Sequence, residues 1–513
     1  MTTQLVWLKR DLRIHDHAPM ARAAERGPVH MVYVYEPSLW RSEEMDGSHL
    51  RFIGECLIEL RDALRVRGAT LVTRIGELPE CFERIHRESA FEAIWSHEET
   101  GNALSFERDK RVARWCRERG IAFHEIPQHG VFRPHPKRDG WAKRWRKRMD
   151  EALTPPVERF TDGPELESAG IVDELGLGIA PSTKKDVQRG GSGRAHEVLE
   201  SFLDHRGVNY RADMSSPVAG WSGCSRLSPH FAWGSISIRE VYQRTRERER
   251  ELKALKSEGA QLDPRWLPSV SSFFKRLSWH CHFIQKLEDE PAIEFQNMSR
   301  VYDGMRENDF DSQRFDAWAE GRTGYPMVDA CMRCVKQTSW LNFRMRAMVV
   351  SFASYHLWLH WRPTALFLAR HFLDFEPGIH FSQFQMQSGV TGINTVRVYS
   401  PAKQARDQDP EGVFIRRWVP ELEGVPLKYL PEPHTMPPLL QRSSGCRIGV
   451  DYPAPVVDHK TAYREARERI FAVRRRDEAR EEAQRVYQKH GSRKRPQRGR
   501  QRKSTAAVTS KSR

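Results

Sequence analysis

The first 126 residues alternate short β-like runs with amphipathic helical stretches, and this alternation constrains the fold more than any other feature. Strands are predicted over residues 5–8, 29–35, 70–73, 93–96 and 121–126, with helices at 49–67 and 104–119 between them. Strand–helix alternation predicts a doubly wound parallel sheet. Such sheets bind ligands at the carboxyl ends of their strands. No Gly-x-Gly-x-x-Gly follows the first strand, so the sequence does not indicate a dinucleotide there.

The rest of the chain has a different pattern. Residues 195–425 show helical periodicity with almost no β signal, and this half contains most of the 15 tryptophans. The sequence therefore predicts an α/β domain followed by an all-α domain. The expected segments are an α/β domain (1–126), a connector rich in Pro, Gly and charge (127–200), a helical domain (201–439), and a charged extension with a basic tail (440–513).

The formal net charge of +15 is concentrated at the C-terminal end. From Arg485 to Arg513 there are eleven Lys and Arg residues and no acid, so the rest of the chain carries only about +4. Such a stretch is expected to be disordered. As a cationic arm it would bind nucleic acid in a salt-sensitive way, because neutralised phosphates release counterions.

The eight cysteines are scattered, which argues against a secreted disulfide framework. Cys331 and Cys334 form a single C-x-x-C at helical spacing, and two buried thiols are expected there rather than metal ligands. No metal site is predicted. The N-terminus has no apolar signal core, and no run approaches the roughly 20 apolar residues of a membrane span. We therefore expect a soluble, cytoplasmic protein.

Two short motifs in the connector each allow a structural and a functional interpretation. Residues 141–148 interleave Trp with Lys and Arg, which fits a solvated helix face better than a nucleic-acid patch. Residues 190–193 read Gly-Gly-Ser-Gly, which fits a flexible joint better than a phosphate cradle.

Five sequence blocks, in order over residues 4–422, resemble the photolyase/cryptochrome family. They are VWLKRDLRIHD at 6–16, SRLSP at 225–229 followed by Gly234, GRTGYPMVDA at 321–330, SPAKQ at 400–404 and DPEGVFIRRWVPEL at 409–422. The resemblance implies an N-terminal antenna-type domain and a helical domain that holds FAD. It also implies a central cavity into which a flipped-out DNA lesion enters. A second antenna chromophore, folate or deazaflavin, stays open because its binding residues align poorly around 97–108.

The resemblance also implies a set of FAD-binding residues. They are Tyr210, Cys224, Ser225, Arg226, Leu227, Ser228, Phe273, Arg276, Arg344, Arg346, Asp374, Glu376 and His380. The turn at 224–228 would hold the phosphates through hydroxyl and N–H groups, although Ser-x-x-Ser-Pro is also an ordinary helix cap. Cys224 stands where the family usually has Thr. Arg344 and Asp374 match an Arg–Asp pair beside the isoalloxazine, where a cation stabilises reduced flavin.

The implied catalytic residues are Trp279, Arg276, His380 and Arg344. Trp279 is kept from the repair photolyases, but Arg276 replaces a Glu and cannot accept the hydrogen bonds of a lesion. Arg276, Trp279 and Phe283 would share one helical face. His380 stands where the family has an Asn near flavin N5. With a pKa near 6.5 it could donate a proton between pH 5 and 9; the alternative is a histidine turned away into a helix contact.

Family members commonly carry electrons to the flavin through three tryptophans. Trp361 and Trp318 match the outer two positions, and Phe384, which is harder to oxidise, takes the innermost one. Trp340 is the expected substitute, with Trp358 and Tyr399 as further candidates. Core packing is the alternative for each.

The predicted function is that of a monomeric, FAD-dependent DNA photolyase, a carbon–carbon lyase driven by blue light. An electron would pass from reduced flavin to a pyrimidine dimer in damaged single- or double-stranded DNA. One alternative is a cryptochrome-like blue-light photoreceptor that signals through flavin reduction and tail movement. The other is a flavin-bearing nucleic-acid binder without turnover.

Overall fold

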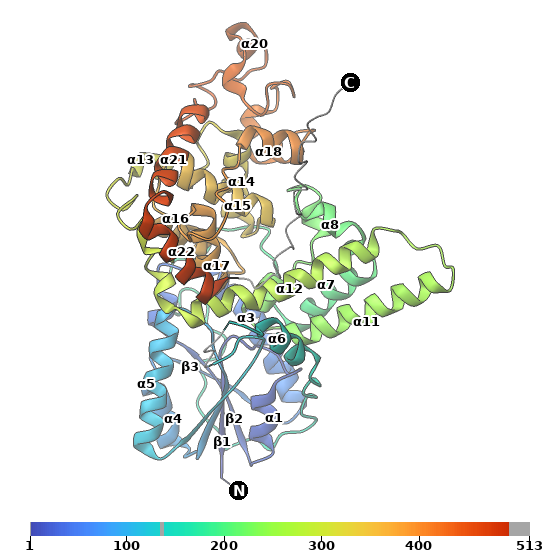
Figure 1. The fold of residues 1–513 in the computed structure, drawn as a ribbon. Helices are drawn as coiled ribbons and strands as arrows, with labels where there is room; N and C mark the ends of the chain where they lie inside the picture. The colour runs from blue at the N-terminus through green and yellow to red at the C-terminus, as the bar shows by residue number, and fades with distance from the viewer. Residues whose placement is uncertain (1, 134–137, 492–513) are drawn as a thin grey trace, which may run out of the picture.

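The computed structural model describes residues 2–133 and 138–491, with an α/β domain stacked below a larger helical domain (Figure 1). The sheet of the α/β domain has the strand order β3-β2-β1-β4-β5, and every neighbouring pair is parallel. The five predicted strands are all present, as β1 (Gln4–Leu8), β2 (Val29–Tyr35), β3 (Leu71–Ile75), β4 (Ala93–His97) and β5 (Ala122–Ile126). The doubly wound fold is therefore confirmed.

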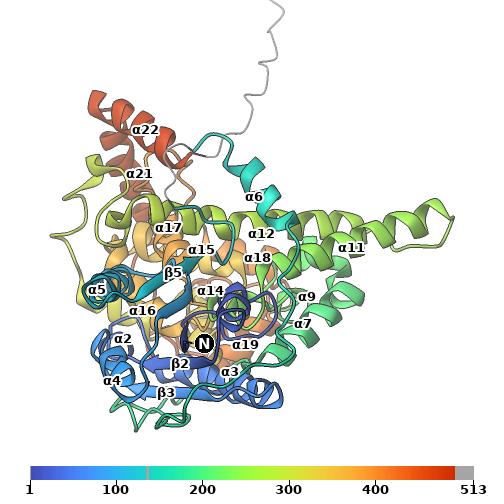
Figure 2. The ribbon, with the colours of Figure 1, turned by 90° about the horizontal axis from the view of Figure 1, so that it is seen from below.

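Helices cover both faces of this sheet because alternate side chains of each strand point to opposite sides. Val6 and Leu8 pack with α1 (Ala18–Ala24) and α3 (Gly47–Val66). Leu5 and Trp7 pack on the other face with α4 (Glu80–Glu88) and α5 (Ala103–Arg119). Figure 2 shows the sheet from below, between these helices. A strand buried on both faces reads as a continuous apolar run, as the sequence has it.

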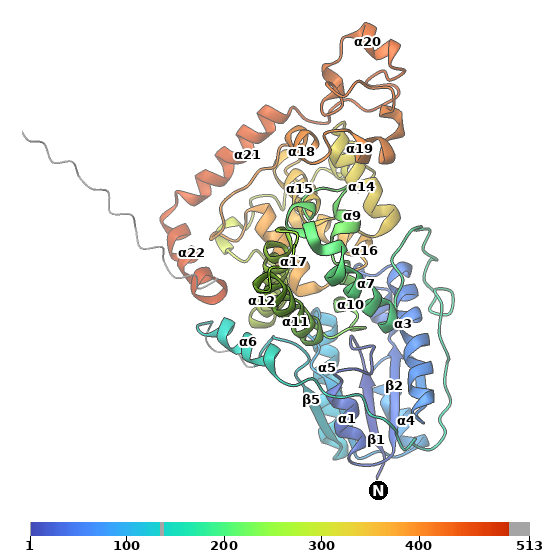
Figure 3. The same cartoon turned by 90° about the vertical axis from the view of Figure 1, so that its right-hand side faces the viewer.

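Residues 151–191 run as a long strap along the outside of the α/β domain (Figure 3). The Val29 N–H donates to the Thr161 carbonyl, and the Gly163 N–H donates to the Val29 carbonyl, both at 2.9 Å. Further along, the Ala169 N–H donates to the Thr73 carbonyl at 2.9 Å. This part of the connector is therefore bound to the edge of the sheet domain.

The Gly-Gly-Ser-Gly segment is a packed contact rather than the flexible joint we expected. The Gly190 N–H donates to Glu55 of α3 at 2.6 Å, and the Gly193 N–H donates to Glu59 of the same helix. A Cβ at Gly190 would meet the Phe52 carbonyl oxygen at 2.2 Å, so only glycine allows this approach. The N–H groups of Gly190 and Gly193 are thus occupied by carboxylates of α3, and the Gly191 N–H donates to Cys56 Sγ at 3.1 Å.

The basic, Trp-containing segment forms helix α6 (Trp141–Asp150). Trp141, Trp145 and Met149 are buried in the core beside α11 and α12, whereas Lys143 and Lys147 are exposed. The tryptophans are therefore core residues, and the cations form the solvated face that the pattern favoured.

The helical domain packs around a large apolar core and a second, smaller one that contains residues of α6, α7, α11 and α12. The C-x-x-C motif lies in α14 (Pro326–Thr338), where both thiols are free and buried, as predicted. No helix among the described residues is long and apolar enough to cross a membrane. Residues 492–513, most of the predicted basic tail, lie outside the described residues.

The remaining helices are α2 (Pro37–Trp40), α7 (Ser192–Asp204), α8 (Tyr210–Asp213), α9 (Gly220–Gly223), α10 (Ser228–Ala232), α11 (Ile238–Ser257), α12 (Trp266–Asp289), α13 (Ser312–Ala319), α14 (Pro326–Thr338), α15 (Phe343–Ser351), α16 (Trp361–His371), α17 (Pro377–Ser388), α18 (Pro401–Gln408), α19 (Val413–Trp418), α20 (Pro438–Ser443), α21 (His459–Arg474) and α22 (Asp477–His490).

Candidate functional site

A cavity of about 290 Å³ lies in the middle of the helical domain. Its walls come from the turn before α10, from α12, from α15 and from α17, and they are mostly apolar with a few convergent charges. That composition is typical of a cofactor site. The lining residues are Tyr210, Met214, Cys224, Ser225, Arg226, Ser228, Arg276, Trp279, His280, Phe283, Trp340, Leu341, Asn342, Phe343, Arg346, Ala347, Val350, Phe372, Asp374, Glu376, Ile379, His380, Gln383, Phe384 and Gln387.

At one end of the cavity, Arg226 is held between two indole rings. Its guanidinium lies 4.6 Å from the centre of the Trp221 ring and 4.0 Å from that of Trp340. Its backbone is left-handed, with φ +62°, a strained conformation that recurs at ligand clamps. Burial lowers the pKa of Arg226 to about 10, so it stays a cation at neutral pH. The turn thus presents a fixed positive charge to the cavity.

The Arg–Asp pair of the cavity is formed by Arg346, and the prediction that Arg344 would pair with Asp374 was wrong. Arg346 Nη1 and Nη2 donate to the two oxygens of Asp374, each at 2.9 Å. Burial opposes ionisation of Asp374, but Arg346 outweighs it and holds the pKa of that carboxyl below its usual value. Residues two apart on a helix point in nearly opposite directions. Because Arg346 faces the cavity, Arg344 does not line it.

Two other predicted cofactor residues do not reach the cavity either. Leu227 is completely buried in the core behind the turn. Phe273 lies in the same core, with its ring centre 4.8 Å from that of Phe202 and 5.8 Å from that of Tyr210. Each of them supports a lining residue from behind instead of contacting a ligand with its side chain.

Several polar atoms of lining residues are buried without a hydrogen-bond partner among the described residues. They are Arg226 Nη1, Arg276 Nη1, Asn342 Oδ1 and Glu376 Oε1. An unpaired buried guanidinium nitrogen is costly, and a pyrophosphate would satisfy that of Arg226 through charge-assisted hydrogen bonds. Together with the aromatic walls, these atoms fit FAD.

At the mouth of the cavity, Arg276 lies between two partly exposed rings. Its guanidinium is 4.7 Å from the centre of the Trp279 ring and 5.0 Å from that of Phe343. Trp279 is 42% exposed and Phe343 is 43% exposed. The sequence identified Arg276 and Trp279, and it marked Phe343 only as a departure from the family pattern, without a role of its own. The mouth therefore offers two aromatic faces and one cation to a ligand from solvent.

His380 lines the cavity, but its ring is already engaged. Its Nε2 lies 2.8 Å from the Ala365 carbonyl, which only accepts, so Nε2 carries the proton. Burial lowers the pKa of His380 to about 4. His380 is therefore neutral between pH 5 and 9, and the expected proton transfer from a charged His380 in that range is not supported.

The predicted relay tryptophans do not form a chain that runs from the protein surface to the cavity. Trp361 and Trp318 are both fully buried, so neither forms a surface end. The Trp361 ring centre lies 6.4 Å from that of Phe381. The His380 ring centre lies 4.5 Å from that of Phe384. Trp340 lines the cavity itself. Only Trp340, of the three, is placed directly against the cofactor site.

The structure adds lining residues that the motifs did not contain. Ile379, Gln383 and Gln387 share one face of α17 with His380 and Phe384. Their spacing of three and four residues is the signal that could have identified them. Asn342 and Phe372 carry no such pattern.

A smaller cavity, of about 70 Å³, lies beside the carboxyl ends of β1 and β2. Arg108 crosses it, with Nη1 2.8 Å from Glu36 Oε1 and Nη2 2.8 Å from Asp109 Oδ1, and it also contacts Glu99. Burial raises the pKa of Glu36 to about 7, in spite of Arg108. This is where a second chromophore would be sought in a doubly wound domain, but the buried cation Arg108 is already paired within the protein.

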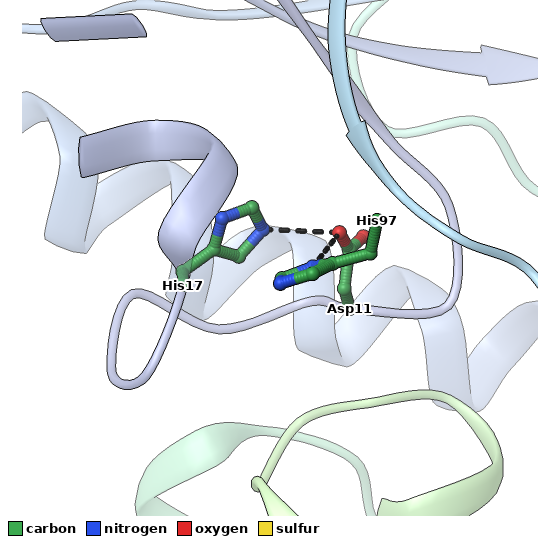
Figure 4. A group of neighbouring side chains, drawn as sticks. All are labelled: Asp11, His17 and His97. Atoms are coloured by element: carbon green, nitrogen blue, oxygen red, sulfur yellow. Dashed lines mark hydrogen bonds and ion pairs between the residues drawn. The ribbon is translucent and has the colours of Figure 1, made fainter. Parts of the chain in front are cut away.

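Asp11, His17 and His97 form a buried cluster that has the residue types of a metal site (Figure 4). Asp11 Oδ2 lies 2.8 Å from His97 Nδ1 and 3.1 Å from His17 Nε2. His17 Nδ1, however, accepts the Met20 N–H, so His17 Nε2 must carry the proton and has no lone pair for a metal. A metal ligand shows the opposite arrangement. The cluster is a hydrogen-bonded support at the start of α1.

Comparison with known proteins agrees with this geometry. Residues 4–155 match the family described as DNA photolyase, and residues 273–472 match the FAD binding domain of DNA photolyase. A cryptochrome DASH of Gloeobacter violaceus is 28% identical over 89% of this chain and 93% of its own length. A deoxyribodipyrimidine photo-lyase of Agrobacterium fabrum is also 28% identical, over 91% of this chain and 97% of its own.

A solved structure shares the whole architecture. The class III photolyase from Agrobacterium tumefaciens superposes with a TM-score of 0.81, covering 93% of this chain and 98% of its own, at 24% identity. The matched domains, the relatives and the cavity between α12, α15 and α17 lead to one conclusion: this chain belongs to the photolyase/cryptochrome family and carries its FAD-binding domain.

Proposed function

We propose that the protein is a light-driven, FAD-dependent photolyase that acts on damaged DNA. The observation that carries this proposal is the mouth of the cavity, where Arg276 lies between the half-exposed rings of Trp279 and Phe343. An enzyme that acts on a base must take it out of the stack, and aromatic faces bind unstacked bases. A cation between them can meet the phosphate of the flipped nucleotide.

When bound, reduced FAD would supply the electron that splits a pyrimidine dimer. The residues of this chain would bind and orient the two partners. Arg226 and the turn before α10 would hold the phosphates, and the Arg346–Asp374 pair would fix the charge beside the ring system. The apolar walls exclude water, which strengthens these interactions.

A repair assay tests the proposal directly. The purified protein should release FAD on denaturation. Under blue light it should repair cyclobutane or (6-4) lesions in single- or double-stranded DNA. The same absorption spectrum tests for a second chromophore through a band beyond those of flavin. Absence of light-dependent repair on all four substrates by the flavin-loaded protein would refute the photolyase proposal.

Trp279→Ala is the sharpest variant for the DNA-binding part of the proposal. Loss of one base–aromatic stack costs roughly 1–3 kcal/mol, about a 5- to 150-fold weaker Kd. The measurement is fluorescence anisotropy with a lesion-containing oligonucleotide. Phe471→Ala removes an aromatic ring with similar exposure from α21, outside the cavity, and should leave the Kd unchanged. Equal affinities of wild type and Trp279→Ala would show that lesions do not enter here.

One observation favours a photoreceptor as the second candidate. Arg276 occupies the position at which repair photolyases present a hydrogen-bond acceptor to the lesion. A guanidinium group only donates hydrogen bonds. A cryptochrome-like protein would take up blue light and undergo flavin reduction without repairing either lesion. The assay above therefore separates the two functions.

A further inference from the structure

Glu376 lies between the flavin cavity and a second, much smaller cavity at the boundary of the two domains. It lines both. Its carboxyl group is buried, with Oε2 3.5 Å from Arg10 Nη1, and Oε1 has no hydrogen-bond partner within 2–133 and 138–491. The roles assigned above use this carboxyl group only as an unpaired acceptor beside the cofactor, not as a proton carrier.

The interdomain cavity has a volume of about 20 Å³, which is enough for about one water molecule. His280 of α12 also lines both cavities, and His129 and Gln128 line the small one. The ring of His129 lies 6.5 Å from that of His280, and its Nε2 lies 3.3 Å from Thr100 Oγ1. Groups that can exchange protons thus lead from the N-terminal domain to the edge of the flavin cavity.

We propose that Glu376 takes up a proton when the flavin in the main cavity gains an electron, and that this proton arrives through the interdomain cavity. The inference rests on the flavin binding of the proposed function, but not on DNA repair.

The charged groups around Glu376 decide when this can happen. Burial raises the pKa of Glu376 to about 7, Arg10 lowers it, and Glu99 raises it. A negative charge gained in the adjacent cavity would raise it further. Glu376 thus has one pKa with oxidised flavin and a higher one with reduced flavin. At a pH between these two values, Glu376 binds one proton when the flavin is reduced. Below about pH 7 the group is protonated in both states and contributes nothing.

The other titratable groups of the flavin cavity cannot take this role at neutral pH. Glu98, whose pKa burial also raises to about 7, lines only the interdomain cavity. Asp374 is held ionised by its two bonds to Arg346. His380 and His280 are neutral because burial lowers the pKa of each to about 4. Arg226 stays a cation, because burial lowers its pKa only to about 10.

The proposed step balances in charge and atoms. One electron passes to the flavin from an external one-electron donor, such as the mediator of a redox titration. One proton passes from water to the carboxylate of Glu376, and no bond to carbon forms or breaks. The net charge of the buried region stays constant, which removes most of the cost of placing an uncompensated charge there.

The test is the reduction potential of the bound flavin in the full-length protein, measured between pH 5 and 9. For the wild type, the potential should fall more steeply above about pH 7, by up to about 59 mV per pH unit for one electron and one proton. Glu376→Gln should lose this added slope. The infrared difference spectrum on reduction gives a direct signal: the carbonyl band of a newly protonated carboxyl group should appear in wild type and be missing in Glu376→Gln.

Two variants keep the test decisive. Glu294 is a buried acid whose pKa burial also raises to about 7, and it lines neither cavity, so Glu294→Gln should keep the wild-type slope and band. Arg10→Gln removes the cation that lowers the pKa of Glu376 and should move the onset of the slope to higher pH. This variant decides the question if Glu376→Gln loses its flavin.

An unchanged slope and band in Glu376→Gln, or an unchanged onset in Arg10→Gln, would overturn the proposal. A wild-type protein that binds no flavin would overturn both this inference and the proposed function. Loss of repair activity with an intact pH dependence would affect the proposed function alone.

Discussion

The flavin cavity and the cavity of the N-terminal domain both contain buried arginines, but these arginines differ in what remains for a ligand. Arg108 contacts three carboxylates of its own domain. Arg226 and Arg276 each keep a buried Nη1 without a partner in the described part of the chain. A cation that is neutralised within the protein is structural, whereas one with an unused N–H in a cavity selects an anionic ligand.

The largest effect is expected from Asp374→Ala in the flavin cavity. Removing one partner of a buried ion pair costs roughly 3–5 kcal/mol, here at the lower end because Arg346 is partly exposed. Urea unfolding should show the loss, and the flavin-to-protein absorbance ratio should fall close to zero. Asp407→Ala breaks the exposed pair with Lys403 and should change stability by less than about 1 kcal/mol, with full flavin content. Normal FAD content in Asp374→Ala would contradict the proposed position of the ring system.

Arg108→Ala should separate stability from ligand binding. The variant leaves three acids around a missing cation and should lose roughly 3 kcal/mol of unfolding free energy. Its folded fraction should still bind FAD at the wild-type ratio, because Arg108 does not line that cavity. Lys110→Ala, on the same helix but in the exposed pair with Glu107, is the matched control. Loss of flavin from folded Arg108→Ala would mean that the two cavities are coupled.

Acid should weaken the N-terminal domain through Glu99. Burial opposes its ionisation, but Arg108, Lys9 and Arg10 lower its pKa to about 2. An acid with a lowered pKa contributes stability above its ordinary pKa near 4.5, and that contribution disappears as the pH falls from 4.5 toward 2. Unfolding free energy measured over this range should fall more steeply for wild type than for Glu99→Gln. Parallel curves would show that the network around Arg108 does not depend on this acid.

The smallest effect is expected from Arg226→Lys. The variant keeps the charge, but an ammonium group cannot stack flat between Trp221 and Trp340 or present a planar pair of donors. FAD affinity should fall roughly ten-fold, equivalent to about 1.4 kcal/mol, in a titration of flavin fluorescence. Arg417→Lys, stacked on Trp418 outside the cavity, should bind FAD normally. Unchanged affinity in Arg226→Lys would show that charge alone holds the phosphates.

Most of the fold could be predicted because its signals are local. Strands β1 and β2 are runs of mostly apolar residues, as in residues 29–35, and the C-x-x-C of α14 lies at helical spacing. The choice between Arg344 and Arg346 could not be made in this way. Two arginines separated by one residue fit the same motif, and only the rotation of α15 about its axis decides which one meets Asp374.

Residues that act through tertiary contacts were also beyond the reach of the sequence. The pKa of His380 depends on its burial and on the carbonyl of Ala365, which belongs to the neighbouring helix α16. The small cavity beside Glu376 joins segments as far apart in the chain as Arg10 and Glu376, which are separated by 366 residues. Neither fact leaves a periodic trace that a sequence pattern could reveal.

The strap of residues 151–191 has a consequence for how the molecule can be divided. A fragment that ends after β5 would lose the Thr161 carbonyl and the Gly163 N–H, the two partners of Val29 in β2. It would also lose Phe160, which is buried in the core under α3. The N-terminal domain is therefore completed by chain that lies beyond its last strand. Expressed alone, residues 1–126 should aggregate, whereas a fragment that reaches residue 191 should fold.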